Sequence, residues 1–277
     1  MKTRYKHDEY GDHASERYQA LTPYYFTAVA LFLIIALKLY AYAVSGAASM
    51  LGSLVDSVGD VVLSCFAFLS IRVALKPADH EHRFGHGKAE GFSALVQACF
   101  LCGAAVFLCF EAFFRLFEPS VVDNHTLGIG VWVVCIFLTV FIVFVQKRAY
   151  AKAPSLALKA DQFHYKGDVL LNVAVIVAFV VDLYGGFAYA DPLISFGIAL
   201  YILRTAKHIG KDAVDMLMDR EIDQEDRQKI IDIVTGHEAV HGMHDLRTRN
   251  SGMHVYISFD VELEGDLTLE DAHAITR

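Results

Sequence analysis

Two pairs of ionisable residues lie in the middle of long apolar stretches of the sequence. Asp56 and Asp60 form one pair, and His164 and Asp168 form the other, each with a spacing of four residues. This spacing places both side chains of a pair on the same face of a helix. Three carboxylates and an imidazole suit a divalent transition metal. We therefore predict a metal site formed by these four residues, with interhelical hydrogen bonding by protonated acids as the alternative.

The composition places these pairs in a membrane. The chain has 277 residues, of which 55% are hydrophobic, and six stretches approach the roughly 20 residues needed to cross a bilayer. The predicted spans are residues 23–45, 48–72, 89–117, 126–147, 155–182 and 189–208. Residues 1–22 are polar and charged, which predicts an N-terminal arm rather than a cleavable signal. The sequence predicts an α-helical membrane protein with six transmembrane helices.

Lysine and arginine residues predict how the helices are oriented. They occur in the N-terminal arm and in the connections after the second and fourth spans, whereas the other three connections contain none. Because basic residues are enriched in cytoplasmic loops, both termini are expected on the cytoplasmic side.

The five cysteines all lie within predicted spans, and we interpret them as small buried hydrophobic residues.

The four candidate ligands are expected at similar depth in the bilayer. Asp60 and Asp168 lie near the midpoints of their spans, and at 1.5 Å per residue their partners lie within roughly one turn of them. Lys166 lies between the two ligands of the fifth span and projects from another face, where its role stays open. Lys38 in the first span is interpreted as an ion-pair partner rather than a metal ligand.

Residues 209–277 have a different character and are expected to form a cytoplasmic domain. The segment from Asp212 onward holds sixteen acidic and six basic residues, an excess that argues against nucleic acid as a partner. Residues 224–235 have an amphipathic helical pattern, 244–249 and 255–263 have strand patterns, and 268–276 begins a second helix with Thr268 as its N-cap. This order predicts a small α+β domain that lacks a last strand.

Two further clusters contain metal-binding residue types. Asp79, His82 and His86 lie in the connection after the second span and offer one carboxylate and two imidazoles; the alternative is a solvated, pH-responsive polar loop. The second candidate set lies in the tail and consists of His237, His241, His244 and His273. Acidic tails rich in histidine often attract metal without a specific site, so this second cluster is a weaker candidate.

Four motifs give the chain a resemblance to a known family. They are Ser53-Leu-Val-Asp-Ser-Val-Gly-Asp60, Phe84-Gly-His-Gly-Lys-Ala-Glu90, His164-Tyr-Lys-Gly-Asp168 and His244-Asp-Leu-Arg-Thr-Arg249. Together they resemble the cation diffusion facilitator family, and in particular its bacterial zinc/proton antiporters. The resemblance implies a homodimer of six-helix subunits with a ferredoxin-like cytoplasmic domain. It also implies that Asp56, Asp60, His164 and Asp168 form the transport site and that Asp79, His82 and His86 form a loop site.

The resemblance carries over less completely to the tail. His244 and His273 match positions that help to bind a two-metal cluster in the family, whereas Asp260 stands where relatives carry histidine. The sequence ends at Arg277, before the expected last strand and its ligands. Lys88 and Asp219 match a charge interlock between the membrane helices and the cytoplasmic domain.

These observations together predict a secondary transporter rather than an enzyme. We expect efflux of a divalent transition metal across the bacterial inner membrane by proton-coupled alternating access. Zn²⁺ is the expected substrate, because imidazole suits zinc whereas oxygen-only sites suit manganese. Cd²⁺, Fe²⁺, Mn²⁺ and Co²⁺ are the alternatives. Zn²⁺ is also expected as a structural or regulatory ligand. A metal-gated channel, a metal sensor and an intramembrane metalloenzyme are the alternative functions.

Overall fold

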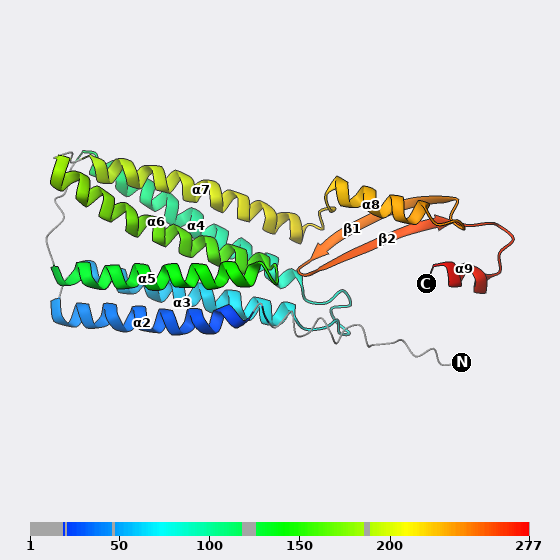
Figure 1. The fold of residues 1–277 in the computed structure, drawn as a ribbon, viewed down its shortest axis with the longest axis horizontal. Coiled ribbons are helices and arrows are strands. Elements are labelled where there is room, and N and C mark those ends of the chain that lie inside the picture. The colour runs from blue at the N-terminus through cyan, green and yellow to red at the C-terminus, as the bar shows by residue number, and fades with distance from the viewer. Residues whose placement is uncertain (1–18, 20, 46–47, 118–125, 186–188, 277) are drawn as a thin grey trace.

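The structure is a computed structural model that describes residues 19, 21–45, 48–117, 126–185 and 189–276. Its long helices run along a common axis, and a smaller part built on a β-hairpin extends beyond one end of them (Figure 1). The helices are α2 (Thr22–Ser45), α3 (Ala48–Ala74), α4 (Lys88–Arg115), α5 (Thr126–Tyr150), α6 (Leu156–Gly185) and α7 (Ala190–Leu217). These helices match the six stretches that the sequence predicts as spans.

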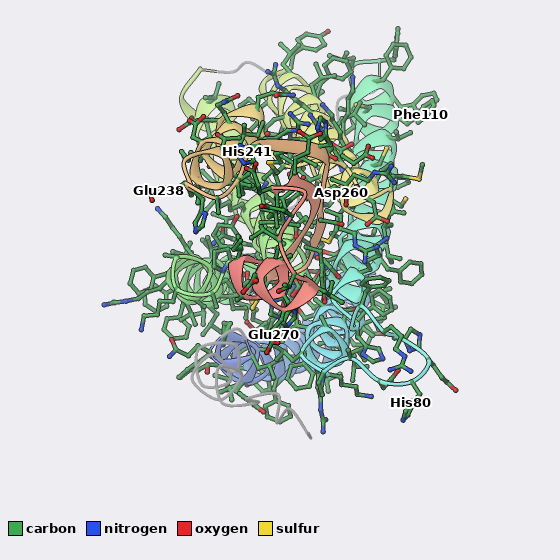
Figure 2. All side chains as sticks on the ribbon, turned by 90° about the vertical axis from the view of Figure 1, so that its right-hand side faces the viewer. His80, Phe110, Glu238, His241, Asp260 and Glu270 are labelled. Carbon is green, nitrogen blue, oxygen red and sulfur yellow. The ribbon has the colours of Figure 1, made fainter. Side chains whose placement is uncertain are left out.

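Four of these helices are apolar enough over a sufficient length to cross a membrane. The qualifying segments within the described residues are Thr22–Val44, Ser53–Ala74, Lys88–Arg115 and Gly130–Tyr150. Their outer surface is strongly hydrophobic, with Phe32, Phe107 and Phe137 each at least 69% exposed. Figure 2 shows Phe110 of α4 pointing away from the bundle in the same manner. An apolar surface of this kind is expected where side chains face lipid.

Small residues bring the helices close together inside the bundle. The largest contact lies between α4 and α7, where Ala94, Ala98, Ala206 and Ala213 are almost completely buried. Small side chains permit this close approach, which drives helix association where water is absent. α7 continues to Leu217, so the boundary expected after residue 208 falls inside a continuous helix. Hydropathy falls along these last turns, but no proline interrupts the helix.

The remaining elements form the tail domain, which we define as residues 220–276. It contains α8 (Gln224–Thr235), the antiparallel strands β1 (Gly242–Ser251) and β2 (His254–Glu262), and α9 (Leu269–Ile275). The α-β-β-α order confirms the element order expected from the sequence, and Thr268 caps α9 by accepting a hydrogen bond from the Asp271 amide. The described sheet has two strands.

The sequence did not predict the irregularity in β1. The register of the hairpin shifts between His244 and Arg247, and Asp245 adopts a positive φ of 50°. Aspartate tolerates this left-handed conformation better than most residues. The resulting bulge leaves His244 opposite Asp260 and restores regular pairing from Arg247 onward.

The tip of the hairpin lies against the loop between α3 and α4. A Cβ atom on Gly87 would come within 2.1 Å of the Ser251 carbonyl oxygen. Tyr256 donates a hydrogen bond to the Phe84 carbonyl at 2.8 Å, and the Arg249 guanidinium lies 3.7 Å from the centre of the Phe84 ring. The loop that carries Asp79, His82 and His86 is therefore packed directly against the tail domain.

Lys88 joins the start of α4 to the end of α7. Its ammonium donates to the Leu217 carbonyl at 3.2 Å and to the Asp219 carboxylate at 2.9 Å. The first contact places a cation at the C-terminus of α7, where unpaired carbonyls favour positive charge. The pairing predicted for Lys88 and Asp219 is thus present, and because both side chains are about 40% exposed it contributes little energy.

We predict that Gly87→Ala destabilises the junction between the bundle and the tail domain. The new methyl group collides with the backbone of Ser251, and overpacking of this kind costs about 1–3 kcal/mol. Gly103→Ala in α4 is the control, because a Cβ atom there meets nothing within 4 Å. Thermal unfolding of the full chain in detergent should show a lower melting temperature for Gly87→Ala than for Gly103→Ala. Equal melting temperatures would contradict the close contact.

Candidate metal centres

One cluster of metal-binding side chains lies inside the bundle, between α3 and α6. The His164 Nε2 atom lies 2.9 Å from a carboxylate oxygen of Asp60 and 3.7 Å from one of Asp168. One potential ligand atom from each residue lies within 4.8 Å of the other two. Asp60 comes from the middle of α3, and the other two project from α6 one turn apart. We call Asp60, His164 and Asp168 the midplane group.

The surroundings hold the imidazole of His164 in place. Phe100 of α4 and Tyr165 pack edge-on against its ring, with ring centroids 5.9 and 5.4 Å away. The His164 side chain is only 7% exposed. Its Nδ1 atom and one carboxylate oxygen of Asp168 are buried without a hydrogen-bond partner among the described residues. Buried polar atoms are normally paired, so this group has unused capacity to bind a cation.

The fourth predicted ligand, Asp56, is not a member of this group in the part of the chain that the structure describes. It lies one turn away on α3 with an exposed side chain. Nearby, the buried Lys38 of α2 donates to the Ser57 hydroxyl at 2.6 Å and to the Ser53 carbonyl at 3.0 Å. Lys38 therefore binds polar atoms of α3 beside the predicted ligands. Among the described residues it forms hydrogen bonds to a hydroxyl and a carbonyl, whereas the sequence predicted an ion pair.

Lys166 lies away from the midplane group. Its ammonium donates to the Gln162 side chain at 3.0 Å and lies 4.4 Å from the centre of the Phe163 ring. Both contacts are on α6 itself, so the structure places this lysine along its own helix and outside the cluster of ligands.

A second buried polar network, which the sequence analysis missed, adjoins the midplane group. Ser64 of α3 donates to the Asp161 carboxylate at 3.0 Å and is 2.7 Å from the Tyr165 hydroxyl. Gln146 of α5 donates to the same carboxylate at 2.7 Å. Asp161 is completely buried. The sequence does carry a signal for this network. Ser64 follows Asp60 by four residues, and Asp168 follows Asp161 by seven residues, and both are spacings that place two side chains on one face of a helix.

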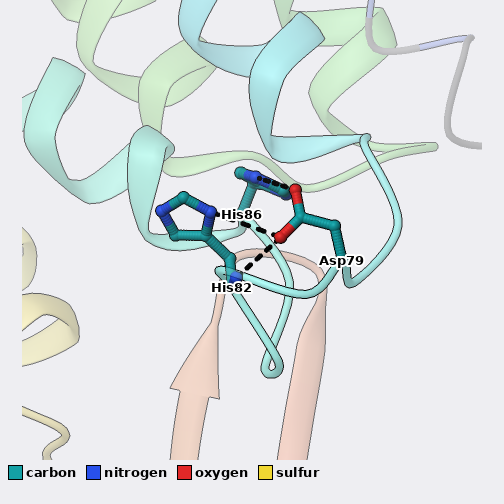
Figure 3. Close-up of side chains that lie close together, drawn as sticks. All are labelled: Asp79, His82 and His86. Atoms are coloured by element: carbon teal, nitrogen blue, oxygen red, sulfur yellow. Dashed lines mark hydrogen bonds and ion pairs between the residues drawn. The ribbon is translucent and has the colours of Figure 1, made fainter.

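The second cluster lies in the loop between α3 and α4 and contains the three predicted residues (Figure 3). Asp79 lies between the two imidazoles, with its carboxylate oxygens 3.5 Å from His82 Nδ1 and 3.3 Å from His86 Nε2. The candidate ligand atoms lie within 4.8 Å of one another. The Nδ1 atom of His86 is buried without a hydrogen-bond partner among the described residues. One carboxylate and two imidazoles in this arrangement suit Zn²⁺.

Backbone hydrogen bonds hold the Asp79 carboxylate in this position. The amides of His82 and Glu81 donate to one of its oxygens, at 2.6 and 3.0 Å. These donors, the His82 amide first, lower the pKa of Asp79 below its ordinary value. The Asp79 carboxylate is therefore held in the ionised form that can bind a metal at neutral pH.

The tail residues are not brought together as a metal site within the described structure. His244 pairs with Glu262 at 2.9 Å rather than with Asp260, which lies opposite it in the hairpin. Figure 2 shows Asp260 on the hairpin, with His241 and Glu270 at separate positions around it. His273 lies in the last turn of α9. None of these residues belongs to a described group of three ligand atoms.

We predict that Asp79 makes the loop sensitive to acid. A lowered folded-state pKa means that the ionised carboxylate stabilises the loop above the ordinary pKa of about 3.9, and that this contribution is lost as the pH falls through the lowered value. Hydrogen–deuterium exchange in the presence of a chelator should show the Glu81 and His82 amides protected at neutral pH and exposed in strong acid. Asp79→Asn should weaken their protection at neutral pH, and unchanged protection would contradict the assignment.

Comparisons with known proteins agree on the family. The cation efflux transmembrane domain matches residues 25–218, and the cytoplasmic domain of cation efflux proteins matches residues 222–277. A cation-efflux pump FieF of Shewanella oneidensis is 48% identical over 243 residues, covering 88% of this chain and 82% of the relative. The pump of the same name from Yersinia pestis is 42% identical over 249 residues, covering 90% of this chain and 82% of the relative. The chain belongs to the cation efflux family, also called the cation diffusion facilitators.

Proposed function

We propose that the protein exports a divalent transition metal, with Zn²⁺ as the main substrate, in exchange for protons. The observation that carries this proposal is the midplane group, in which Asp60, His164 and Asp168 meet inside an apolar bundle. Ionisable residues at bilayer depth are costly and commonly mark an ion pathway. The cation efflux pumps among the relatives support the direction of transport.

The chemistry of the ligands supplies the coupling to protons. A metal binds to neutral imidazole and ionised carboxylates, so its arrival displaces protons from these groups. In the metal-free state the short contact between His164 and Asp60 is well suited to hold a proton. Proton binding from the external side then releases the metal, and metal binding from the cytoplasmic side releases the protons. Alternating exposure of one site to the two sides converts proton entry into metal efflux.

Asp56 is proposed to complete the ligand set as the fourth member of the transport site. It lies one helical turn from Asp60 on α3, a distance that a small rotation or shift of the helix could close. Structural changes of this size are typical of packed helices. With both termini in the cytoplasm, Asp56 lies on the external side of Asp60, and its exposed position in the described conformation makes it a suitable last contact for a departing cation.

The ligand set favours zinc but does not restrict the site to it. One imidazole with carboxylates suits Zn²⁺ and Cd²⁺, and it tolerates Fe²⁺, Co²⁺ and Mn²⁺ less well. We propose that the loop group of Asp79, His82 and His86 holds a second zinc ion with a structural or regulatory role, because its residues contact the part of the loop that packs against the tail domain.

Three other functions fit the observations less well. An intramembrane metalloenzyme needs an open coordination position and a nearby general base. Asp56, as the proposed fourth ligand, would occupy that position, and each carboxylate and imidazole of the midplane group is itself a proposed ligand. A sensor would leave this group without a purpose. A metal-gated channel shares the ligands but conducts without exchanging protons, so proton-coupled, saturable flux distinguishes the carrier from it.

The assembly that we propose is a homodimer in the bacterial inner membrane with both termini in the cytoplasm. All six bundle helices are proposed to span, because α6 and α7 are as long as the four apolar helices and pack against members of that group. The tail domain, proposed to be ferredoxin-like, presents Val255, Ile257 and Phe259 in an exposed row on β2. An apolar row of this kind suits burial against further structure or a second subunit.

The decisive experiment is zinc-dependent proton flux in proteoliposomes. Asp60→Asn and Asp60→Ala should lower the flux by about tenfold or more, since loss of even an outer-shell partner typically costs 10–100-fold at metal sites. Glu111→Gln is the control, because it removes a carboxylate of α4 that pairs with Arg115 outside both metal groups. Equal flux in wild type and the Asp60 variants would place the transport site elsewhere. Zinc flux without any proton movement would indicate a channel.

We predict that His164→Asp changes the metal preference of the transporter. Loss of the only imidazole in the midplane group leaves oxygen ligands, which favour Mn²⁺ relative to Zn²⁺. Competition assays should show that the ratio of zinc to manganese transport falls in His164→Asp, while His86→Asp in the loop leaves the ratio unchanged. A preference that stays the same in His164→Asp would exclude His164 from metal selection.

A further inference from the structure

A groove of about 650 Å³ opens on the outer face of the bundle, between α4 and α7. These two helices lie side by side along the bundle (Figure 1). Ala98 and Ala206 form its buried floor, and a Cβ atom on Gly210 would lie 3.5 Å from that of Ala98. Leu95 and Leu203 line its sides. The groove exists because small residues replace the large side chains that cover the helices elsewhere.

Unpaired cations lie along the α7 side of this groove. Arg204 and Lys207 line it, and Lys211 follows on the same face of α7, at spacings of three and four residues. All three side chains are exposed. Within the described residues, none of them has an acidic partner or a hydrogen bond, in contrast to Lys88 and Lys159 on the same side of the molecule. Their charge is therefore available to a ligand.

Along α7 these cations lie between the level of the midplane group and the bilayer surface on the side of the tail domain. The apolar stretch of α7 ends near residue 208, and the helix then continues toward the tail domain to Leu217. Gly167, beside the midplane group, packs against Ile202, so Lys207 lies roughly 7–8 Å beyond that level at 1.5 Å per residue. Long basic side chains at this depth extend to the lipid headgroups. From there the groove leads back along Leu203 and Cys102 into the apolar layer.

We propose that this groove binds one phospholipid with an anionic headgroup. Arg204 and Lys207 hold the phosphate and the headgroup charge, and one acyl chain lies over the small residues between α4 and α7. The positive charge of the groove favours an anionic lipid over a second protein subunit, because a subunit would have to supply acidic residues at the level of the headgroups. Basic pockets between transmembrane helices bind anionic lipids by the same chemistry. The site is separate from both metal groups, so the inference does not depend on the transported ion.

Native mass spectrometry of the full chain in detergent tests this site. The protein is titrated with phosphatidylglycerol and, separately, with phosphatidylethanolamine carrying the same acyl chains. Wild type should bind the anionic lipid more tightly. Arg204→Gln/Lys207→Gln should weaken that binding by roughly thirtyfold, from about 1 kcal/mol per basic residue near the membrane surface, and should remove the preference.

The matched control is Lys147→Gln/Arg148→Gln at the end of α5. It removes the same charge from exposed residues near the same end of the bundle and should keep the wild-type preference. Cys99→Phe fills the groove without altering charge and should weaken binding of both lipids. A single symmetric peak in size-exclusion chromatography and an unchanged melting temperature confirm that each variant is folded.

Three results would overturn the proposal. The first is a preference for phosphatidylglycerol that survives in Arg204→Gln/Lys207→Gln. The second is a preference that falls equally in the α5 control. In the third, Cys99→Phe would leave lipid binding unchanged while converting a dimer to a monomer, which would identify the groove as a surface between two copies of the chain.

Discussion

The contact between His164 and Asp60 is the interaction on which the rest of the membrane part depends. An ionisable residue at the bilayer centre costs about 2.5–3.5 kcal/mol on insertion scales, and the midplane group contains three. The cost is offset only if the groups compensate one another's charge or bind a cation. The 2.9 Å contact joins α3 to α6 across the bundle, and Phe100 and Tyr165 fix the imidazole that makes it. Metal binding and proton binding would be alternative ways to satisfy the same buried groups, and this is the physical basis of the exchange mechanism that we propose.

One polar stripe along α3 connects this contact to the neighbouring helices. Ser57 accepts from Lys38 of α2, Asp60 meets His164, and Ser64 binds Asp161 of α6. Every polar side chain of the stripe has a partner on another helix, so a shift of α3 must exchange several hydrogen bonds together. Such a stripe favours two discrete arrangements over gradual sliding. At the end of α3 the chain enters the loop with Asp79 and His86, and this loop packs against the hairpin through Gly87 and Phe84. A change in the position of α3 would therefore act directly on the tail domain through this loop.

Much of this arrangement follows from local patterns in the sequence. Apolar stretches of the required length predicted the six helices, and Gln224–Thr235 was predicted with the same bounds that the structure has. The loop cluster was predicted because its ligands are close in sequence. Asp161 was missed because its helical spacing from Asp168 does not identify its partners, and those partners, Ser64 and Gln146, come from other helices. The bulge at Asp245 and the end of α7 were missed for a related reason, since hydropathy does not encode a local backbone conformation or a helix that continues beyond the membrane.

The central claim is that the midplane group binds the transported metal through one imidazole and carboxylate oxygens. X-ray absorption at the zinc edge tests it most directly, on the full chain with His82→Ala and His86→Ala to remove the loop site and with one zinc ion per chain. The account predicts a single imidazole with oxygen ligands at about 2.0–2.2 Å, and loss of the imidazole signal when His164→Ala is added. A spectrum with several imidazoles, with sulfur at about 2.3 Å, or unchanged by His164→Ala would contradict it.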